Sequence, residues 1–409
     1  MDRIRLTRRA YLSRLAGGLA CLPAFSAPPP GRIKITGFEI HKVSLRWRDM
    51  LFIEVKTDAG LTGLGEGTLE GRADAVENEL RWLEESYLGR DPSGIEEHWN
   101  RTYYLLSRWR NGPPAMTALS AIDIALWDIE GKRLNQPVWR LLEGPLQSSL
   151  RAYYTHWHAS LEGSNRTPER FGAWARETRS RGWTAVKWSV PMGGSESERI
   201  ARLIRELEAV RGAIGASMDL ALEASETFTV RSAVQLAKAI APYNPLWIEE
   251  PTLRESPRGL GDVAASSPVP IATGEGLFTR YEFSELLERK GAAIIQPDVM
   301  HAGGITEIRK IANLAETYGV EVAPHQCSGP IGHVASLTAM SVCRNFLVQE
   351  WESADDALYT EMTEGKYPVQ NSGTVSLPEG PGLGLAVNFT EFKKRCPYKP
   401  KYIPASLPR

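Results

Sequence analysis

Seven ionisable side chains recur along the chain, each at the end of a short apolar run. The run in PLWIEEP (245–251) is typical of a buried strand, yet it ends in the adjacent acids Glu249 and Glu250. Carboxylates in an apolar setting are costly unless something neutralises them. One polar residue at a strand end is common, but a whole series dominated by acids indicates a shared site. Its members, spaced 23 to 36 residues apart, are Lys187, Glu223, Glu249, Glu275, Asp298, His325 and Glu350.

Three of the acids, Glu223, Glu249 and Glu275, predict a metal site. Carboxylates held close together repel one another and raise one another's pKa unless a cation lies between them. A hard divalent ion that prefers oxygen ligands, Mg²⁺ above all, would neutralise them. Glu250 must face the other way, because adjacent strand residues point to opposite sides. We expect it to make a salt bridge or loop hydrogen bonds.

Asp298 and His325 predict a general base. A carboxylate that fixes the tautomer of an imidazole leaves the other ring nitrogen free to take a proton. A lone histidine is more often structural, but His325 follows a predicted strand and has a candidate partner at the preceding strand end.

The elements that would position these residues are short apolar runs alternating with helical stretches over residues 146–364. Helical periodicity is clear in ESERIARLIRELEAVRG and ITEIRKIANLAETYG. Eight strands with helices between most of them indicate a parallel (β/α)8 TIM-type barrel, whose active site gathers at the carboxyl ends of its strands. The eight runs are LRAYYTHW, TAVKWSV, MDLALE, LWIEEP, PIATGE, AAIIQPD, VEVAPH and FLVQE.

A different pattern precedes the predicted barrel. Residues 32–145 begin with two alternating, strand-like runs joined by a turn at Asp58–Gly60, and they continue with helices such as MTALSAIDIALWDIEGKRL. Residues 365–409 are rich in Pro and Gly and contain no further βα unit. We therefore predict an α/β protein in which an α+β domain, completed by the C-terminal segment, accompanies the barrel.

Residues 1–30 have the pattern of an export signal. A basic segment with the pair Arg8–Arg9 precedes an apolar stretch that is too short to span a bilayer. The arginine pair, followed by an aromatic residue and a leucine, resembles a twin-arginine signal. We expect export to the periplasm rather than a disordered basic start. Lipid attachment at Cys21 is disfavoured, because Gly18 stands where an aliphatic residue would be wanted.

Composition excludes several other classes of function. Hydrophobic residues make up 42% and charged residues 24% of the 409 residues, which is typical of a globular protein. The net charge of −1 gives no reason to expect nucleic acid or an anionic membrane as a partner. Beyond Cys21 only three cysteines remain, without metal-like spacing, so a disulfide framework is not expected. No other segment predicts stable membrane insertion.

Several stretches together resemble the enolase superfamily, in its mandelate racemase/muconate lactonizing enzyme-like branch. They are AIDIALWDIEGKRLNQPVWRLLEG, LWIEEPT, IATGEGLFTRYEF, QPDVMHAGGITEIRKIANLAE, APHQCSGPIGHVA and PGLGL. The resemblance covers residues 32–395 and is strongest to galactonate-type sugar-acid dehydratases. It implies a capping domain over a modified barrel, a small sugar-acid substrate and, as a further expectation, a homo-oligomer.

The resemblance also implies a mechanism. Mg²⁺ would be held by the three acids at 223, 249 and 275, His325 and Asp298 would form the base dyad, and Glu350 would lie by the substrate carboxylate. The shared chemistry is removal of the proton α to a carboxylate, which requires preorganised positive charge. Loss of a β-hydroxyl then gives an enol that becomes a 2-keto-3-deoxy acid.

Four positions depart from the pattern of that group. The usual Lys-x-Lys motif is Lys187-Trp188-Ser189 here. The second lysine, a base in racemases, is therefore missing, and Lys187 is left to steady the substrate carboxylate. Glu223 stands where the group usually has Asp. Ser225 stands where it has a histidine that serves as general acid, and Gly276 stands where an arginine is common. Racemase activity is disfavoured, because it needs an acid/base on each face of the substrate.

Residues near the predicted mouth would set specificity. His156, Trp157 and His158 end the first strand run and are candidates to line the mouth, with packing beneath the cap as the equal alternative. Loops at 46–50 and 66–72 are expected to contact the substrate from the cap.

A Mg²⁺-dependent acid-sugar dehydratase is the leading hypothesis. Within the family, the alternatives are a cycloisomerase, a racemase or a one-base epimerase-like lyase. A degenerate exported carboxylate-binding protein is the alternative from another class, but such a protein has no need of a base dyad. A retaining glycosidase would also carry paired carboxylates, without the lysine and the His–Asp pair.

Overall fold

The structure, a computed structural model, describes residues 33–158, 161 and 165–401. The predicted export segment, 1–30, lies outside the described residues. Among the residues described, no helix combines the length and the apolar character needed to cross a membrane. All elements below belong to one compact unit, Lys34–Arg409.

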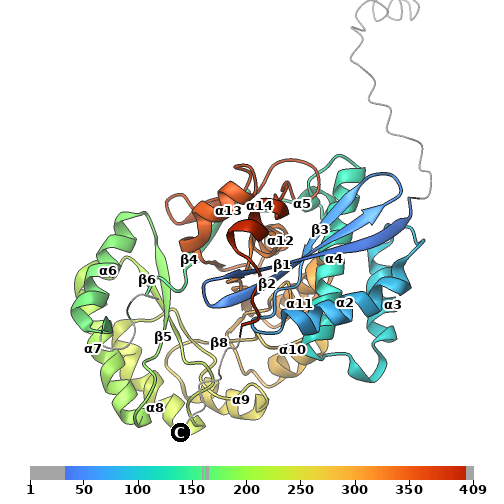
Figure 1. Ribbon diagram of the computed structural model, residues 1–409. Helices are drawn as coiled ribbons and strands as arrows, with labels where there is room; N and C mark the ends of the chain where they lie inside the picture. Colours follow the sequence, from blue (N-terminus) through green and yellow to red (C-terminus); the bar gives the residue numbers. More distant parts are fainter. Residues whose placement is uncertain (1–32, 159–160, 162–164, 402–409) are drawn as a thin grey trace, which may run out of the picture. The chain divides into compact units, whose positions relative to one another are not determined.

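An antiparallel sheet of three strands, in the order β1–β2–β3, begins the cap. The turn predicted at Asp58–Gly60 joins its second and third strands. Four helices follow, and α2, α3 and α4 lie beside the sheet in Figure 1. The cap elements are β1 (Ile35–Leu45), β2 (Arg48–Thr57), β3 (Thr62–Glu66), α2 (Ala73–Tyr87), α3 (Ile95–Leu105), α4 (Pro113–Arg133) and α5 (Val138–Leu141).

Helix α4 is buried on most sides, which explains why its sequence is apolar nearly all round. It packs so closely on β3 that a Cβ atom at Gly65 would come within 2.0 Å of the carbonyl oxygen of Ala121. Its buried Asp128 accepts hydrogen bonds from the backbone N–H groups of Leu64 and Leu383, 2.8 Å each. Helix α4 thereby joins the cap sheet to the C-terminal part of the chain.

Eight parallel strands form the barrel, in the order β11–β4–β5–β6–β7–β8–β9–β10. Backbone hydrogen bonds of 2.8 Å from Val322 to Asn345 and from Leu347 to Val322 close the ring. The strands are β4 (Ser149–Tyr154), β5 (Ala185–Ser189), β6 (Asp219–Glu223), β7 (Trp247–Glu249), β8 (Ile271–Thr273), β9 (Ile294–Ile295), β10 (Glu321–Val322) and β11 (Gln349–Trp351).

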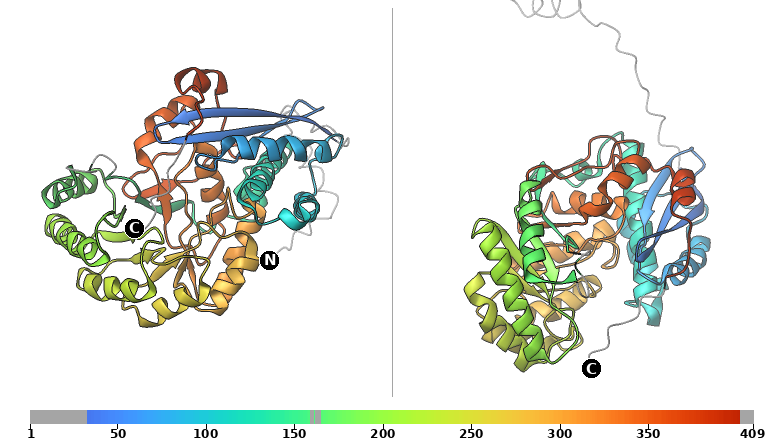
Figure 2. Two further views of the ribbon diagram at one scale, coloured as in Figure 1. Left: turned by 60° about the horizontal axis from the view of Figure 1, so that its bottom comes forward. Right: turned by 60° about the vertical axis from the view of Figure 1, so that its left-hand side comes forward.

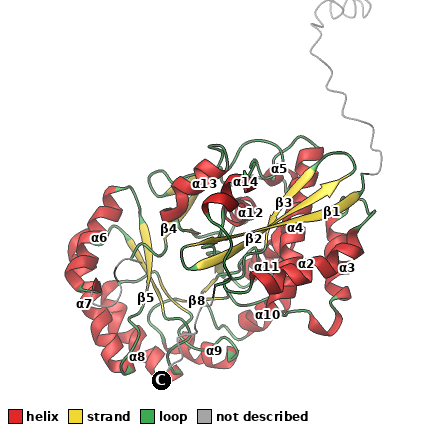
Figure 3. Cartoon of the chain, in the orientation of Figure 1, coloured by secondary structure: helices red, strands yellow, loops and turns green. Residues whose placement is uncertain are grey.

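Helices connect successive barrel strands and cover them from outside, as Figure 3 shows. Local signals explain where they begin: Ser195 and Glu198 form a capping box at the start of α7, and Pro stands in the first turn of α6, α9 and α12. These helices are α6 (Pro168–Ser180), α7 (Glu196–Ile214), α8 (Val230–Ile240), α9 (Pro257–Ser266), α10 (Thr279–Glu288), α11 (Gly304–Thr317) and α12 (Pro330–Met340).

The interior of the barrel explains why chemistry appears at regular intervals. Each strand, or the residue directly beside it, contributes one buried residue to an apolar layer: Tyr153, Ala185, Ala221, Trp247, Ala272, Ile294, Ala323 and Val348. Side chains two positions further along a strand point the same way. Five of these layer residues are followed, two positions later, by an ionisable residue, so polar side chains come next after the apolar layer. They are Lys187, Glu223, Glu249, His325 and Glu350.

The last part of the chain returns to the cap. After α13 (Asp356–Met362), strand β12 (Thr374–Ser376) pairs with β4, and α14 (Phe389–Arg395) packs against β1. Phe389 stacks on His41 with ring centroids 4.0 Å apart. Figure 2 shows this red segment beside the blue cap strands.

The predicted fold class, an α+β cap with a modified (β/α)8 barrel, is confirmed. Three strands are shorter than their apolar runs suggest, because β8, β9 and β10 end at Thr273, Ile295 and Val322. Glu275, Asp298 and His325 therefore lie on the loops that leave those strands. The chain turns at once after β8, where Gly274 has a φ of 132°.

Candidate active site

A cavity of about 1060 Å³ opens at the carboxyl ends of the barrel strands. Both parts of the chain line it: the cap contributes Trp47, Leu69, Glu70 and Arg72 among others. Five of the seven predicted residues line it directly, namely Lys187, Glu223, Glu275, His325 and Glu350. The other two, Glu249 and Asp298, are fully buried behind this wall. The structure thus brings all seven predicted residues to one mouth.

Glu223, Glu249 and Glu275 form a compact group. One carboxylate oxygen of each lies within 4.8 Å of the others. Burial, and then repulsion from Glu249 and Glu275, raises the pKa of Glu223 well above its usual value. A divalent cation would remove that repulsion, so the charge and the oxygen donors of the group fit Mg²⁺.

Glu249 has further partners that sequence reasoning missed. Its carboxylate accepts hydrogen bonds from Trp247 Nε1 (2.9 Å) and Gln296 Nε2 (2.6 Å), and it pairs with Lys187. Trp247 stands two residues before Glu249, so both side chains point to the same face of the strand. This spacing in the sequence indicates the contact between them. Gln296 directly follows β9, 47 residues from Glu249, and its position depends on the closed barrel.

Lys187 lies between two buried acids. Its ammonium group pairs with Glu249 and lies 2.9 Å from Glu350 Oε1. Burial alone would lower the pKa of Lys187, but these two carboxylates hold it well above the usual value. Glu350 also accepts a hydrogen bond of 2.8 Å from the backbone N–H of Gln326. Lys187 therefore remains charged and is poorly suited to act as a base.

His325 and Asp298 form the predicted dyad. Nδ1 of His325 lies 2.7 Å from Asp298 Oδ2, and the other oxygen of Asp298 accepts a hydrogen bond from the backbone N–H of Met300. Although burial opposes it, the nearby His301 and His325 lower the pKa of Asp298. An ionised carboxylate can only accept, so Nδ1 of His325 carries the proton. Nε2 is left facing the cavity, 3.5 Å from Glu275 Oε2.

The cap reaches the dyad through side chains that the sequence did not single out. His301 Nε2 lies 3.0 Å from the carbonyl oxygen of Thr68, and its Nδ1 lies 3.6 Å from Asp298. Cys327 Sγ lies 3.6 Å from His325 Nε2 and 3.8 Å from Glu70 Oε1. The cap loop at 66–72 therefore contacts His301 and Cys327, which lie beside the dyad.

Two family models match the chain. Residues 32–143 match the mandelate racemase/muconate lactonizing enzyme N-terminal domain, and residues 170–391 match the enolase C-terminal domain-like family. The chain belongs to the enolase superfamily.

Relatives of this superfamily member include enzymes with named activities. A D-galactonate dehydratase of Cronobacter sakazakii is 37% identical over 370 residues, which are 87% of this chain and 92% of that protein. Among solved structures, a mandelate racemase/muconate lactonizing enzyme-like protein from Roseovarius sp. TM1035 matches with a TM-score of 0.82 at 30% identity, covering 90% of this chain and 96% of that one. The 3,6-anhydro-D-galactonate cycloisomerase of Zobellia galactanivorans matches with a TM-score of 0.80 at 28% identity, covering 89% and 100%.

One departure from the superfamily pattern has a structural explanation. A Cβ atom at Gly276 would lie 2.6 Å from the guanidinium carbon of Arg254, so Arg254 fills the space left by the missing side chain. Arg254 lies 3.3 Å from Glu226 and 3.8 Å from Glu250. Glu250 also accepts hydrogen bonds from Thr273 Oγ1 and the backbone N–H of Gly274, and burial raises its pKa to about 8.

The other departures leave short side chains in the wall of the cavity. Ser189 and Ser225 both line it. Of the three candidates after the first strand, His156 and His158 line the cavity, whereas Trp157 packs edge-on against Phe171 and Trp188 in the core.

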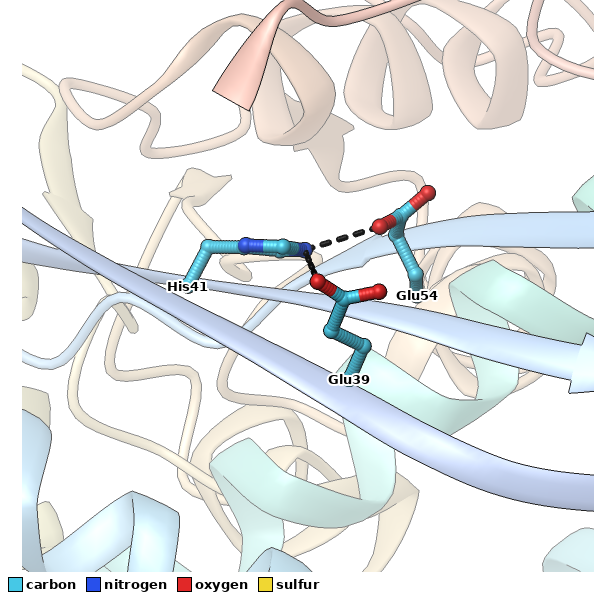
Figure 4. A group of neighbouring side chains, drawn as sticks. All are labelled: Glu39, His41 and Glu54. Atoms are coloured by element: carbon cyan, nitrogen blue, oxygen red, sulfur yellow. Dashed lines mark hydrogen bonds and ion pairs between the residues drawn. The ribbon is translucent and has the colours of Figure 1, made fainter. Parts of the chain in front are cut away.

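A second group of possible ligands lies in the cap sheet, away from the mouth. Glu39 and His41 from β1 and Glu54 from β2 point toward one another, as Figure 4 shows. His41 Nε2 lies 2.8 Å from Glu54 and 3.8 Å from Glu39. Lys56 lies 3.1 Å from Glu54 and 3.3 Å from Glu39, so a cationic side chain already pairs with both acids.

Proposed function

We propose that this chain is a sugar-acid dehydratase with Mg²⁺ as cofactor. The single observation that supports it most is the His325–Asp298 dyad, whose Nε2 lies 3.5 Å from Glu275, a member of the group of three carboxylates. A protein that only binds carboxylates does not need a base. The D-galactonate dehydratase relative, similar along nearly its whole length, supports the same substrate class.

The residues of the chain account for the first half of such a reaction. Glu223, Glu249 and Glu275 would hold Mg²⁺, which supplies positive charge for the substrate carboxylate when bound. Nε2 of His325 takes the α-proton, and Asp298 stabilises the imidazolium that forms. Lys187 adds fixed positive charge beside Glu350. The β-hydroxyl then leaves as water, and the enol becomes a 2-keto-3-deoxy acid.

Cycloisomerisation is a second candidate. It is favoured by the structural likeness to a 3,6-anhydro-D-galactonate cycloisomerase and by Ser225, which leaves this chain without the histidine expected of a galactonate-type dehydratase. In this reaction the leaving oxygen belongs to a ring of the substrate, so no water is released and the product keeps the mass of the substrate.

A library of aldonic, uronic, aldaric and anhydro-sugar acids would test both candidates. We expect a 2-keto acid from at least one of them, detected as its semicarbazone, and its loss on treatment with EDTA and recovery with Mg²⁺. Mass spectrometry separates the two reactions, because only dehydration removes a water. Absence of any keto acid across the library would contradict both.

We also propose that residues 1–30 direct export through a twin-arginine route. Support comes from their sequence pattern alone. A fusion of this segment to a reporter that is active only when folded before export should reach the periplasm, and Arg8→Lys with Arg9→Lys should stop it.

A homo-oligomer is the remaining proposal, and it rests on the resemblance to the superfamily. Light scattering coupled to size-exclusion chromatography should give a mass that is a multiple of 45.3 kDa. A monomeric mass at micromolar concentration would contradict it.

A further inference from the structure

A second imidazole–carboxylate pair lines the same cavity. His156 follows β4, and its Nδ1 lies 2.9 Å from Oε2 of Glu352, which follows β11. The side chain of Glu352 is fully buried, whereas that of His156 is 33% exposed and lines the cavity. Among the described residues, none makes a hydrogen bond to Nε2 of His156. The pair therefore repeats the arrangement of His325 and Asp298 at another place in the mouth.

The charges around Glu352 keep it ionised. Burial would raise its pKa, but the hydrogen bond with His156, together with Arg48 and Arg46, lowers it overall. Both arginines are also paired with Asp355, so the excess positive charge beside Glu352 is small. Because an ionised carboxylate only accepts hydrogen bonds, Nδ1 of His156 carries a proton and Nε2 is directed away from Glu352.

The proposed dehydration needs a proton for its leaving group. Hydroxide leaves poorly, and Ser225 cannot replace the histidine expected as general acid. Four described histidines line the cavity, and two of the others are unsuitable. Burial lowers the pKa of His158 to about 3, so it stays neutral near neutral pH, and both ring nitrogens of His301 face groups of the protein. His325 already has the role of receiving the α-proton. His156 is therefore the one remaining candidate among these four histidines.

We propose that His156 is the general acid of this dehydration, an assignment that rests on the proposed function. His325 takes the α-proton from carbon, and the Cβ–O bond breaks with its electron pair on oxygen. Nε2–H of the His156 imidazolium protonates that oxygen, so water departs. The enol tautomerises to the 2-keto acid, His325 returns its proton to solvent, and His156 takes one up.

A purely structural role makes a different prediction. The ring of His156 meets Trp47, of the turn between β1 and β2, edge-on at 5.7 Å, so it could simply hold the cap over the mouth. Trp47→Leu removes that contact and leaves the pair with Glu352 intact. If the role of His156 is structural, Trp47→Leu and His156→Gln should lower activity by similar factors. Neither loss should then depend on which leaving group the substrate carries.

The test compares two leaving groups on the wild-type enzyme, His156→Gln, Glu352→Gln and Trp47→Leu. One substrate is the sugar acid that the wild type dehydrates, and the other is its 3-deoxy-3-fluoro analogue, whose fluoride leaves without protonation. We expect His156→Gln to lower kcat for the hydroxy acid by about 10²–10⁴-fold. Fluoride release by that variant should stay within about threefold of the wild type, since proton abstraction by His325 is unchanged.

Glu352→Gln should show the same selective loss, less severely, and Trp47→Leu should affect both substrates alike. Equal losses of His156→Gln on the two substrates, or unchanged dehydration of the hydroxy acid, would overturn the assignment. Failure of the wild type on every sugar acid would instead remove the proposed function, and this assignment with it.

Discussion

Two groups of possible metal ligands in this chain have similar dimensions and opposite charge balance. In the cap sheet and at the barrel mouth alike, three ligand atoms lie within 4.8 Å of one another. In the cap, the hydrogen bond from His41 and then that from Lys56 lower the pKa of Glu54 to about 2. At the mouth, burial and neighbouring acids raise the pKa of Glu223. Spacing alone therefore does not identify a cation site, whereas uncompensated negative charge does.

The sharpest way to test this comparison is the same substitution in each group. Glu249→Gln should abolish both Mg²⁺ binding, measured by calorimetry, and turnover, because it removes a central negative charge from the mouth. Glu54→Gln should leave both unchanged. Mg²⁺ binding that survives Glu249→Gln, or is lost in Glu54→Gln, would reverse the roles of the two groups.

The histidines give the next largest contrast. His325→Asn should lower kcat by about 10²–10⁴-fold with little change in Mg²⁺ affinity, because it removes the base and retains the acids. His41→Asn, in the cap, should leave kcat within about twofold. Steady-state kinetics and calorimetry on both variants would check this. A His325→Asn enzyme that keeps more than about a tenth of its activity would contradict the dyad.

Substituting the lysine beside each group of possible ligands should change the stability of the protein by different amounts. Lys187→Met leaves two buried carboxylates without their counter-charge and should cost about 3–5 kcal/mol of unfolding free energy. Lys56 is partly exposed, so Lys56→Met should cost only about 0.2–1 kcal/mol. Urea unfolding without added metal measures both. Similar losses in the two variants would mean that burial does not distinguish the groups.

The smallest expected effect is a change in acid stability. The folded pKa of Glu54, about 2, is below its usual value of 4.5. Its contribution to stability is therefore present above about pH 4.5 and is lost as pH falls toward 2. Glu54→Gln should lower the unfolding free energy above about pH 4.5, including at neutral pH, and should flatten its pH dependence between about pH 4.5 and pH 2. If Glu54→Gln has the same pH dependence of unfolding free energy below about pH 4.5 as the wild type, the cap ion pairs contribute nothing measurable to stability.

The sequence predicted the barrel and the members of the mouth because both follow from local periodicity. Polar residues two positions after an apolar layer residue recur along the chain at the interval of one βα unit, as Ala221 with Glu223 and Ala323 with His325 illustrate. Once parallel strands are inferred, their ends must converge. The roles of these residues stay predictions until the variants are measured.

Other features depend on contacts that no local pattern reveals. Glu352 approaches His156 from a strand end 196 residues away. Arg254 fills the space beside Gly276, which the sequence shows only as a missing arginine. The charge balance among the cap side chains likewise cannot be inferred from the sequence, because it depends on the register of β1 and β2, which places Glu39 opposite Glu54. These partners are selected by packing between distant segments, so a single sequence leaves them open.

The return of the C-terminal segment to the cap has a consequence for how the protein is made. Phe389 and Phe392 pack against Phe52, and the backbone N–H of Ser44 donates a hydrogen bond to the carbonyl oxygen of Cys396. The cap sheet ends at Glu66, and the α14 segment that covers it begins 323 residues later, at Phe389, so the sheet is synthesised long before its cover. A chain that stops early leaves an apolar sheet face uncovered, which is the kind of surface that chaperones hold and proteases attack.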